Sequence, residues 1–281
     1  MPRATASLYG DFCPGTGAEF RTSTNYILAD AIGQFVVGES SAPDSSYACG
    51  RIEHGFWHSD IHIPTINEIK SQPDYSEVSV YAKIVTAGTD ELYRTLYIGE
   101  EDRISGIRVN MGGNAAIVST GDMVDVSGVI KSGDGQRYID YPQITVRFQD
   151  VTLLEPFFMA NRSLGGVGTD VWIPGGGGAN NVSLLIMTTG LVTYVDTATP
   201  VKFFYLDDGS SLSDGLVIGG HTIKGIRVSI TTLAAGNTIA PPQVGDYLSV
   251  TGICVPRSVS GKVLVQLRPR TQGDMVILSG D

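Results

Sequence analysis

Apolar and polar residues alternate with a period of two along several stretches of the chain. Examples are "VYAKIVTA" (80–87), "MVDVSGVI" (123–130) and "YLSVTGICV" (247–255). Successive side chains of a β-strand point to opposite faces, so this alternation predicts strands with one buried face. No helical apolar stripe runs for more than about two turns. The 35 glycines suit tight turns between short strands. We therefore expect an all-β protein.

Stretches of the first half of the chain match stretches of the second half in the same order. The pairs are "KIVT" (83–86) with "GLVT" (190–193), "YIGEED" (97–102) with "YLDDGS" (205–210), "SGIRV" (105–109) with "KGIRV" (224–228), "TGDMVDVSGVI" (120–130) with "VGDYLSVTGIC" (244–254), and "FQDVTLL" (148–154) with "QGDMVIL" (272–278). The offset grows from 107 (190 minus 83) to 124 (244 minus 120) and changes only at turns. Insertions confined to loops are typical of a duplicated β domain.

Each copy of the repeat reads as five strands. The valines of the two "GIRV" segments, Val109 and Val228, are expected at equivalent positions of the third strand. The "GD" pair before the fourth strand fits a turn, which places Asp122 and Asp246 in equivalent turns. These equivalences predict two domains that superpose strand by strand.

The shared pattern "G-x-V … DG … GI-x-V … GD-x-V-x-V-x-G" resembles the OB-fold, a five-stranded Greek-key barrel. Gly128 and Gly252 lie inside the fourth strands and predict bulges, which a small closed barrel needs at its corners. The resemblance covers about residues 80 to 280, apart from a connector. It implies two tandem OB-like five-stranded barrels preceded by a β-rich N-terminal segment.

Two further stretches resemble tandem OB-fold proteins of unknown function that look to be secreted by environmental bacteria. They are the connector, from "FFMANRSLGG" to "GGGGANNVSLLIMTTGLVT", and the N-terminal "YILADAIGQFVVGESS…SYACGRIEHGFW". The second follows a pattern that recurs in those proteins, "Y-x-L … IGQ-x-x-x-G-x-S … Y-x-x-x-x-x-x-GFW". The resemblance implies an extracellular or cell-surface location. It brings no catalytic residues and no cofactor.

The repeat sets the domain boundaries that we expect. Residues 1–70 form the β-rich N-terminal segment and a short linker, 71–157 the first barrel, 158–181 a Gly-rich connector and 182–281 the second barrel. The apolar residues of 1–63 are too few for an independent core. In the connector, Leu164 and Trp172 are candidate anchors between the barrels, and a mobile linker is the alternative.

Charge and hydropathy narrow the expected partners. The formal net charge is −10 and the pI is about 4.8, whereas affinity for nucleic acid comes largely from a basic surface. Nucleic acid is therefore expected to be an unlikely partner. The chain has no apolar run of about 18 residues, so we expect no membrane span. The first residues show no apolar core of a signal peptide.

Three of the four histidines, His54, His58 and His62, lie in "EHGFWHSDIH". Gly55 and Pro64 argue against a helix and favour a strand. On a strand, residues four apart are separated by about 13 Å, which is too far to share one ion. We expect no metal at these histidines.

Acidic residues cluster in matching turns of the two copies. The clustered oxygens are candidate calcium ligands, but the spacing matches no known calcium loop, and "DDG" is an ordinary turn. We therefore expect no bound cofactor or metal. The residues are Glu100, Glu101 and Asp102 in the first copy, with Asp207, Asp208 and Asp214 in the second.

The sequence is compatible with two covalent modifications, a disulfide bond and N-linked glycosylation. Cys13 and Cys49 either pair across a loop or remain free thiols, while Cys254 sits in a strand pattern and is expected to be buried. Asn161 and Asn181 begin N-x-S sequons on the connector, which we expect to be exposed and open to glycans. The alternative is that both sequons are incidental.

The end of the second copy combines basic and aromatic residues, as single-strand-binding OB-folds do. The alternative is that the aromatic residues belong to the barrel core and the charges are solvated. The residues are Arg257, Lys262, Arg268 and Arg270, with Phe203, Phe204 and Tyr205 on the second strand.

No G-x-S-x-G, P-loop or dinucleotide motif is present, so we expect a protein without enzymatic activity. The preferred function is an extracellular structural subunit that assembles with itself, as a filament or surface layer, through strand addition by its N-terminal segment. The alternative is an OB-fold binding module for single-stranded nucleic acid or oligosaccharide. The expected apolar anchors of assembly are Tyr26, Ile27, Leu28, Phe35, Val36, Phe56 and Trp57.

Overall fold

The computed structural model describes residues 20–23, 26–29, 63–113, 117–151, 153–166, 177–198 and 202–279. The chain divides into two units, Met1–Ile63 and Pro64–Asp281. In the first unit, the described part is an antiparallel pair of strands, β1 (Phe20–Ser23) and β2 (Tyr26–Ala29).

Most of the residues singled out in the N-terminal unit lie outside this description. Tyr26, Ile27 and Leu28 lie on β2, but only their backbone is described. The residues that lie outside the described ranges are Cys13, Phe35, Val36, Cys49, His54, Phe56, Trp57, His58 and His62.

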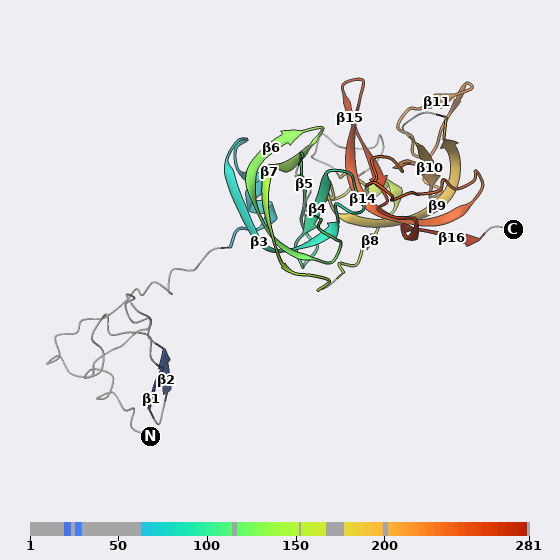
Figure 1. The fold of residues 1–281 in the computed structure, drawn as a ribbon. Coiled ribbons are helices and arrows are strands. Elements are labelled where there is room, and N and C mark those ends of the chain that lie inside the picture. Colours follow the sequence, from blue (N-terminus) through green and yellow to red (C-terminus); the bar gives the residue numbers. More distant parts are fainter. Residues whose placement is uncertain are drawn as a thin grey trace. The chain divides into compact units, whose positions relative to one another are not determined.

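The first barrel is a closed five-stranded sheet that begins the second unit (Figure 1). Its strands are β3 (Glu77–Ala87), β4 (Thr95–Gly99), β5 (Gly106–Asn110), β6 (Met123–Gly133) and β7 (Gln136–Phe148). They follow one another around the barrel in the order β3-β4-β5-β7-β6, and the β5–β7 pair is parallel. The short helix α2 (Ile66–Ser71) packs Ile66 and Ile69 into the same core.

The second barrel repeats this order, and its connecting loops carry additional short strands. Its strands are β9 (Leu185–Asp196), β10 (Phe203–Asp207), β13 (Ile226–Ser229), β14 (Tyr247–Val259), β15 (Lys262–Arg268) and β16 (Met275–Ser279). Around the ring the order is β9-β10-β13-β15-β14, closed by the β14–β9 pair, and β13–β15 is parallel. Strand β8 (Phe157–Phe158) extends the sheet beside β9, and β11 (Val217–Ile218) pairs with β12 (His221–Thr222). Two tandem OB-like barrels are thereby confirmed.

The equivalences expected from the repeat are confirmed. Val109 pairs with a β4 residue and a β7 residue, and Val228 pairs with residues of the matching strands β10 and β15. The carboxylate of Asp122 accepts from the Ser119 N–H at 3.0 Å, and that of Asp246 accepts from the Gln243 N–H at 2.7 Å. The two copies therefore share turns as well as strands.

Gly128 and Gly252 lie where backbone from another strand comes close. The register of β6 against β7 shifts between Ser127 and Val129, so the bulge expected at Gly128 is confirmed. At Gly252 no register shift is recorded, and the residue lies between the part of β14 paired with β16 and the part paired with β15. A methyl group added there would lie 2.6 Å from the Arg268 carbonyl carbon and oxygen.

The last strand of the repeat departs from the expected alignment. Strand β7 is continuous, whereas its counterpart is divided into β15 and β16 by Pro269 and the short helix η3 (Gln272–Asp274). Phe148 pairs with Met123 and Ser279 pairs with Tyr247, so Phe148 corresponds to Ser279 and not to Gln272. Proline has no N–H to donate to a neighbouring strand, and the extra residues of this break displace the alignment.

The two barrels share a buried interface. Ala87, Leu92 and Tyr97 of the first barrel form one cluster with Leu185, Ile253 and Val255 of the second. Backbone bonds run alongside: Tyr93 N–H donates to Thr232 O, and Ala234 N–H to Glu91 O, both at 2.9 Å. The guanidinium of Arg270 donates to Thr86 O at 2.9 Å. Apolar burial and matched hydrogen bonds together hold the barrels as one unit.

Shortening Leu92 to alanine should lower the free energy of unfolding by about 2 to 4 kcal/mol, because its side chain is fully buried between the barrels. Urea denaturation measures this change. Ile117→Ala, at a side chain 79% exposed, is the matched control and should change stability by less than about 0.5 kcal/mol. Equal effects of the two substitutions would contradict a packed interface.

The connector contributes to the second barrel. Leu164 belongs to the core cluster of that barrel, while Trp172 lies outside the described residues. Among the described residues, no helix has both the length and the apolar character needed to cross a membrane.

Candidate functional site: a cationic pocket at the barrel junction

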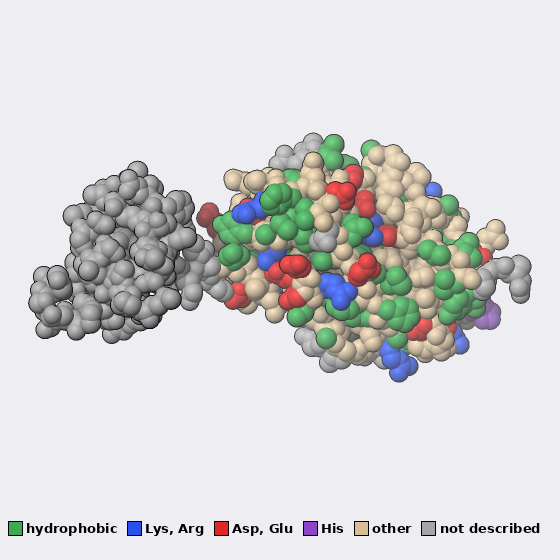
Figure 2. All heavy atoms as spheres, turned by 90° about the horizontal axis from the view of Figure 1, so that it is seen from below, with side chains coloured by type: hydrophobic (Ala, Val, Ile, Leu, Met, Phe, Trp, Pro, Cys, Tyr) green, Lys and Arg blue, Asp and Glu red, His purple; other side chains and the backbone are tan. Residues whose placement is uncertain are grey.

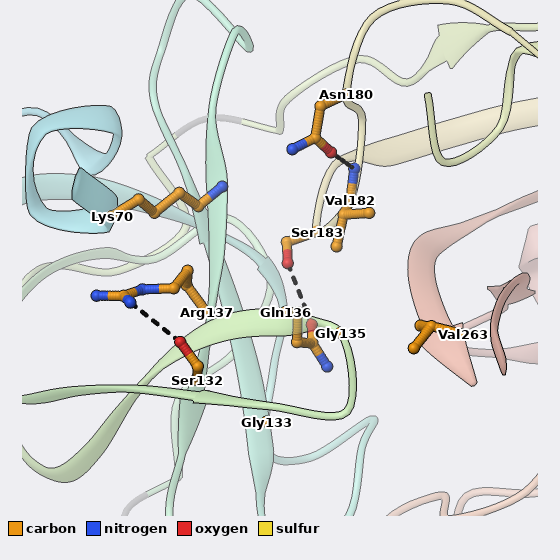
Figure 3. Close-up of a pocket in the computed structure, with 10 residues that line it drawn as sticks. All are labelled: Lys70, Ser132, Gly133, Gly135, Gln136, Arg137, Asn180, Val182, Ser183 and Val263. Atoms are coloured by element: carbon orange, nitrogen blue, oxygen red, sulfur yellow. Dashed lines mark hydrogen bonds between the residues drawn. The ribbon is translucent and has the colours of Figure 1, made fainter. Parts of the chain in front are cut away.

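A pocket of about 460 Å³ lies where the first barrel meets the connector and the second barrel (Figure 3). Four elements form it: the C-terminal turn of α2, the β6–β7 turn, the segment before β9, and β15. This volume falls in the range of small-molecule sites, roughly 300 to 1,000 Å³. Its lining residues are Lys70, Ser132, Gly133, Gly135, Gln136, Arg137, Asn180, Val182, Ser183 and Val263.

Local sequence explains why these walls are ordered. Thr65 and Glu68 form a reciprocal cap that starts α2 and places Lys70 in its last turn. The β6–β7 turn reverses the chain at Asp134 and Gly135, which both have positive φ (53° and 79°). On the opposite wall, the Ser183 N–H donates to Cys254 O at 2.7 Å. Each wall is therefore held by its own backbone bonds.

Two charged side chains line the pocket, Lys70 and Arg137. Arg137 pairs with Asp74, whereas Lys70 has no carboxylate partner in the described part of the chain. Its Nζ lies 3.5 Å from the Ser105 hydroxyl oxygen. No ion pair to Lys70 is present in the described part of the chain, and no carboxylate lines the pocket. Burial lowers the pKa of Lys70 from 10.5 to about 8. The ammonium group is thus partly desolvated and lacks a counter-ion.

The amide groups of the pocket add hydrogen-bond donors. Asn180 accepts from the Val182 N–H through Oδ1 at 3.0 Å, which leaves its Nδ2 to face the pocket toward Lys70 (Figure 3). Gln136 accepts from the Ser183 hydroxyl at 3.4 Å. The guanidinium of Arg137 turns the other way, to Ser132 at 3.0 Å. The Asn180 amide and the Lys70 ammonium therefore face the same space, which no carboxylate lines.

A pair of exposed tyrosines lies beside the pocket on the first barrel. Lys131 Nζ is 5.7 Å from the ring centroid of Tyr75 and 4.5 Å from that of Tyr141. The two side chains are 75% and 73% exposed. Both residues have positive φ, 72° and 51°, which costs roughly 1 kcal/mol or more for residues other than glycine. Backbone of positive φ thus holds two aromatic rings in water around the Lys131 ammonium, which also pairs with Asp140 at 2.8 Å.

The pocket and the tyrosine pair are continuous. Arg137 forms an ion pair with Asp74 at 2.7 Å, and Asp74 precedes Tyr75. Ser132, which lines the pocket, follows Lys131 on β6. We call this combined surface, made of the pocket, Lys131, Tyr75 and Tyr141, the junction site.

Within the junction site, Lys131 pairs with Asp140 at 2.8 Å and Arg137 pairs with Asp74 at 2.7 Å, so the positive charge without a counter-ion is that of Lys70. Figure 2 shows acidic, basic and apolar side chains intermixed over one face of the second unit. The screening length in physiological salt is about 8 Å, so a distant excess of carboxylates is largely screened from a local cation.

The basic end expected on the second barrel is dispersed in the structure. Arg257 pairs with Asp214, Arg268 donates to Thr232 O at 2.7 Å, and Arg270 pairs with Asp274 at 2.7 Å. Of the expected aromatic residues, Phe204 is in the barrel core, whereas Phe203 and Tyr205 are buried on the opposite face of β10. Local ion pairs and the barrel interface therefore use the three arginines, and the aromatic rings are buried in the second barrel.

The acidic turns hold the fold together. Glu100 accepts from the Ile66 N–H and from Lys83 Nζ, both at 2.6 Å. Asp208 accepts from the Asn161 N–H at 2.8 Å. Within the described ranges, no group of three or more histidine, cysteine or acidic residues has the arrangement of a metal site.

The two sequon asparagines differ from the expected exposed sites. Asn161 is 0% exposed and Asn181 is 2% exposed. Asn161 Nδ2 donates to Leu206 O at 2.7 Å, and Asn181 Nδ2 donates to Ser163 O at 2.6 Å. A glycan would have to be attached at these same nitrogen atoms. The prediction that both asparagines are exposed is therefore wrong.

Sequence reasoning missed the residues of the junction site. Lys70 lies in a predicted linker, Asn180 in the Gly-rich connector and Ser183 at the start of the second barrel. The signal available in the sequence was "SGDGQR" (132–137), a tight turn followed by a basic residue. Only the packing of the barrels brings these segments together.

No family model and no curated protein matches this sequence. The chain is similar to several solved structures at low identity. A murine DNA-binding protein with double-stranded DNA has 9% identity and a TM-score of 0.34, over 73% of this chain and 98% of that one. The p202 HIN1 structure with 12-mer double-stranded DNA has 12% identity and a TM-score of 0.31, over 69% and 88%. The Ifi202 HINa domain with 20-base-pair double-stranded DNA has 11% and 0.31, over 69% and 92%.

All three of these structures contain double-stranded DNA by their descriptions. The expectation that nucleic acid is an unlikely partner is corrected on this finding. It rested on net charge, which does not describe a local surface. What this chain binds has to be argued from its own residues.

Proposed function

We propose that the chain is a non-catalytic OB-fold module that binds single-stranded nucleic acid at the junction site. One phosphate group occupies the pocket, and neighbouring bases stack on Tyr75 and Tyr141. The observation that carries this proposal is the partly buried Lys70 ammonium in a pocket lined by hydrogen-bond donors and by no carboxylate.

Electrostatics favours an anionic ligand over a neutral sugar. A charge held away from water is costly unless an opposite charge approaches it. A phosphate would supply that charge and accept hydrogen bonds from Lys70 and Asn180. A neutral oligosaccharide would leave the ammonium uncompensated.

The tyrosines favour a polymer that carries bases. Alternating cations and aromatic rings are the usual composition of single-strand-binding surfaces, where each stacked base contributes about 1 to 3 kcal/mol. Tyr75 and Tyr141 are held in water by backbone of positive φ, an arrangement that burial does not explain. Bases that are already unpaired reach such rings without the cost of opening a duplex.

Fluorescence anisotropy with labelled oligonucleotides tests this proposal. We expect a single-stranded 12-mer to bind more tightly than a duplex of the same sequence, and a neutral oligosaccharide not to compete. A double Tyr75→Ala, Tyr141→Ala variant should lose about tenfold or more in affinity. Competition by the neutral sugar, or equal binding by the double variant, would exclude the proposal.

A second function, self-assembly outside the cell, has one specific observation in its favour. Strand β16 pairs with β14 on one side and has no other partner strand among the described residues. Its Val276, Ile277 and Leu278 are 53%, 61% and 52% exposed. An exposed apolar edge accepts a strand from another chain, and the N-terminal segment of a neighbouring molecule is the proposed donor. The extracellular setting implied by the resemblance belongs to this second proposal.

Sedimentation of the full chain tests assembly. We expect species larger than a monomer, and we expect Ile277→Lys or removal of residues 1–63 to return the protein to a monomer. A full-length chain that remains monomeric at high concentration would rule assembly out.

A further inference from the structure

The outer face of the second barrel holds buried aromatic rings and arginines that lie apart from both the barrel core and the junction site. On β10, Phe204 and Leu206 belong to the core cluster, while Phe203 and Tyr205 point to the other face. These two are nevertheless buried, at 7% and 0% exposure. The ring of Tyr194 lies 6.1 Å from that of Phe203 and 6.4 Å from that of Tyr205.

Two guanidinium groups accompany these rings. Arg227 lies over the ring of Phe203 at 3.4 Å and is 9% exposed. Arg257 contacts the carboxylate of Asp214, whose side chain is 5% exposed. Each of the two arginines has a buried Nε without a hydrogen-bond partner in the described part of the chain. Burial, and then the charge of Arg257, lowers the pKa of Arg227.

Charge in this cluster is unbalanced. Asp214 is the one carboxylate that the described residues bring to it, against Arg227 and Arg257. Its Oδ2 also accepts from the Tyr205 hydroxyl at 2.6 Å. A buried excess of positive charge is costly unless an anion joins it, and the two unpartnered Nε–H groups are donors for that anion.

Asp214 reaches the cluster from a loop that connects β10 to β13. Gly215, directly after it, has φ of 90°, and a methyl group added there would meet nothing within 4 Å. Beyond it, the β11–β12 hairpin is exposed, with Val217 at 55%. The loop is therefore anchored in the core by Leu212 before Asp214 and becomes exposed after it.

We propose that this face of the second barrel is an anion-binding site for a phosphate group attached to an aromatic ring, as in a nucleotide unit, and that Asp214 occupies it as an internal anion. An incoming phosphate takes the place of the Asp214 carboxylate between Tyr205 and Arg257 and accepts from the free Nε–H groups. The aromatic part of the ligand lies against Tyr194 and Phe203. The proposal does not depend on the junction site.

Thermal unfolding with inorganic phosphate tests it. Asp214→Asn keeps the shape of the side chain and removes its charge, so the arginines lose their counter-ion. Phosphate at 20 mM, compared with potassium chloride of equal ionic strength, should then raise the melting temperature by at least about 3 °C more than in the wild type. Asp207→Asn, at the end of β10 and outside the cluster, should respond as the wild type does. An equal response of Asp214→Asn and Asp207→Asn would overturn the proposal.

A second measurement covers the case in which Asp214→Asn does not fold. In the wild type, the Leu216 N–H donates to Asp214 Oδ1 at 3.1 Å, and the Ile223 N–H donates to Leu216 O at 2.8 Å. Displacement of Asp214 by phosphate should speed hydrogen exchange at both amides. Unchanged exchange at saturating phosphate would overturn the proposal. Repeating the experiment with Lys70→Met separates this site from the junction site, because that substitution should leave the response intact.

Discussion

Replacing Lys70 by methionine should make the protein more stable and at the same time weaken its binding to single-stranded nucleic acid by about 10- to 100-fold. The loss corresponds to one hydrogen bond with a charged donor, about 1.5 to 3 kcal/mol. The gain follows from removing an ammonium group that burial holds without a counter-ion. A group that is retained at a cost to stability is typical of a functional site.

The stability gained by Lys70→Met should decrease as the pH rises. The folded pKa of Lys70, about 8, lies below the unfolded value of 10.5, so the unfolded chain binds more protons between these limits. The cost of burying the charge is fully present below pH 8 and is relieved as the pH rises toward 10.5. We expect Lys70→Met to add about 1 to 3 kcal/mol at pH 7, and this advantage to vanish near pH 10.5.

Urea denaturation at pH 7 and pH 10 measures that change, with anisotropy for binding. Lys262→Met, at an exposed lysine of the second barrel, is the matched control and should alter neither quantity appreciably. In the wild type, affinity should fall as the pH passes 8, because the ammonium loses its proton. A destabilised Lys70→Met protein with unchanged affinity would mean that Lys70 serves the fold and not a ligand.

Gly252→Ala should cost about 2 to 4 kcal/mol of stability, one of the largest effects available from a single methyl group. The added Cβ would lie 2.6 Å from the Arg268 carbonyl carbon and 2.8 Å from Pro269 N. These are backbone atoms, so relief requires moving β14 away from β15 where Ile253 pairs with Arg268. That movement opens the second barrel at its corner.

Thermal or urea unfolding of Gly252→Ala measures this cost against a matched glycine. Gly113→Ala is the control, because a methyl group there meets nothing within 4 Å and the backbone has no positive φ. It should change stability by less than about 0.5 kcal/mol. If Gly252→Ala proved equally mild, the close approach of the two strands would be wrong.

The architecture could be predicted from the sequence because both copies show the same local patterns at matching positions. Alternation marks the strands, and the "GD" turns and "GIRV" strands fall at matching positions, as Val109 and Val228 show. It fails at the last strand, where Pro269 divides the second copy's strand in two. An interruption of the strand pattern within one strand cannot be distinguished, in sequence, from a loop that separates two strands.

The candidate site was not predictable in the same way. Lys70, Asn180 and Ser183 come from a short helix and from the segment before β9, both outside the repeat, and only the docked barrels bring them to one pocket. For the arginines near the C-terminus, the sequence left a basic binding surface and solvated charges as alternatives. Arg268 and Arg270 look like a basic surface in sequence, yet they donate to backbone carbonyls at the barrel interface. Net charge was also a poor guide, since it averages over the whole chain.

The salt dependence of oligonucleotide binding tests most directly whether a phosphate occupies the pocket beside Lys70. Each phosphate neutralised on a single strand contributes about 0.7 to the slope of log K against log salt concentration. Binding of a single-stranded 12-mer to the wild type and to Lys70→Met should therefore give slopes that differ by about 0.7, with the variant less steep. Parallel slopes for the two proteins would contradict a phosphate contact at Lys70 and with it the proposed function.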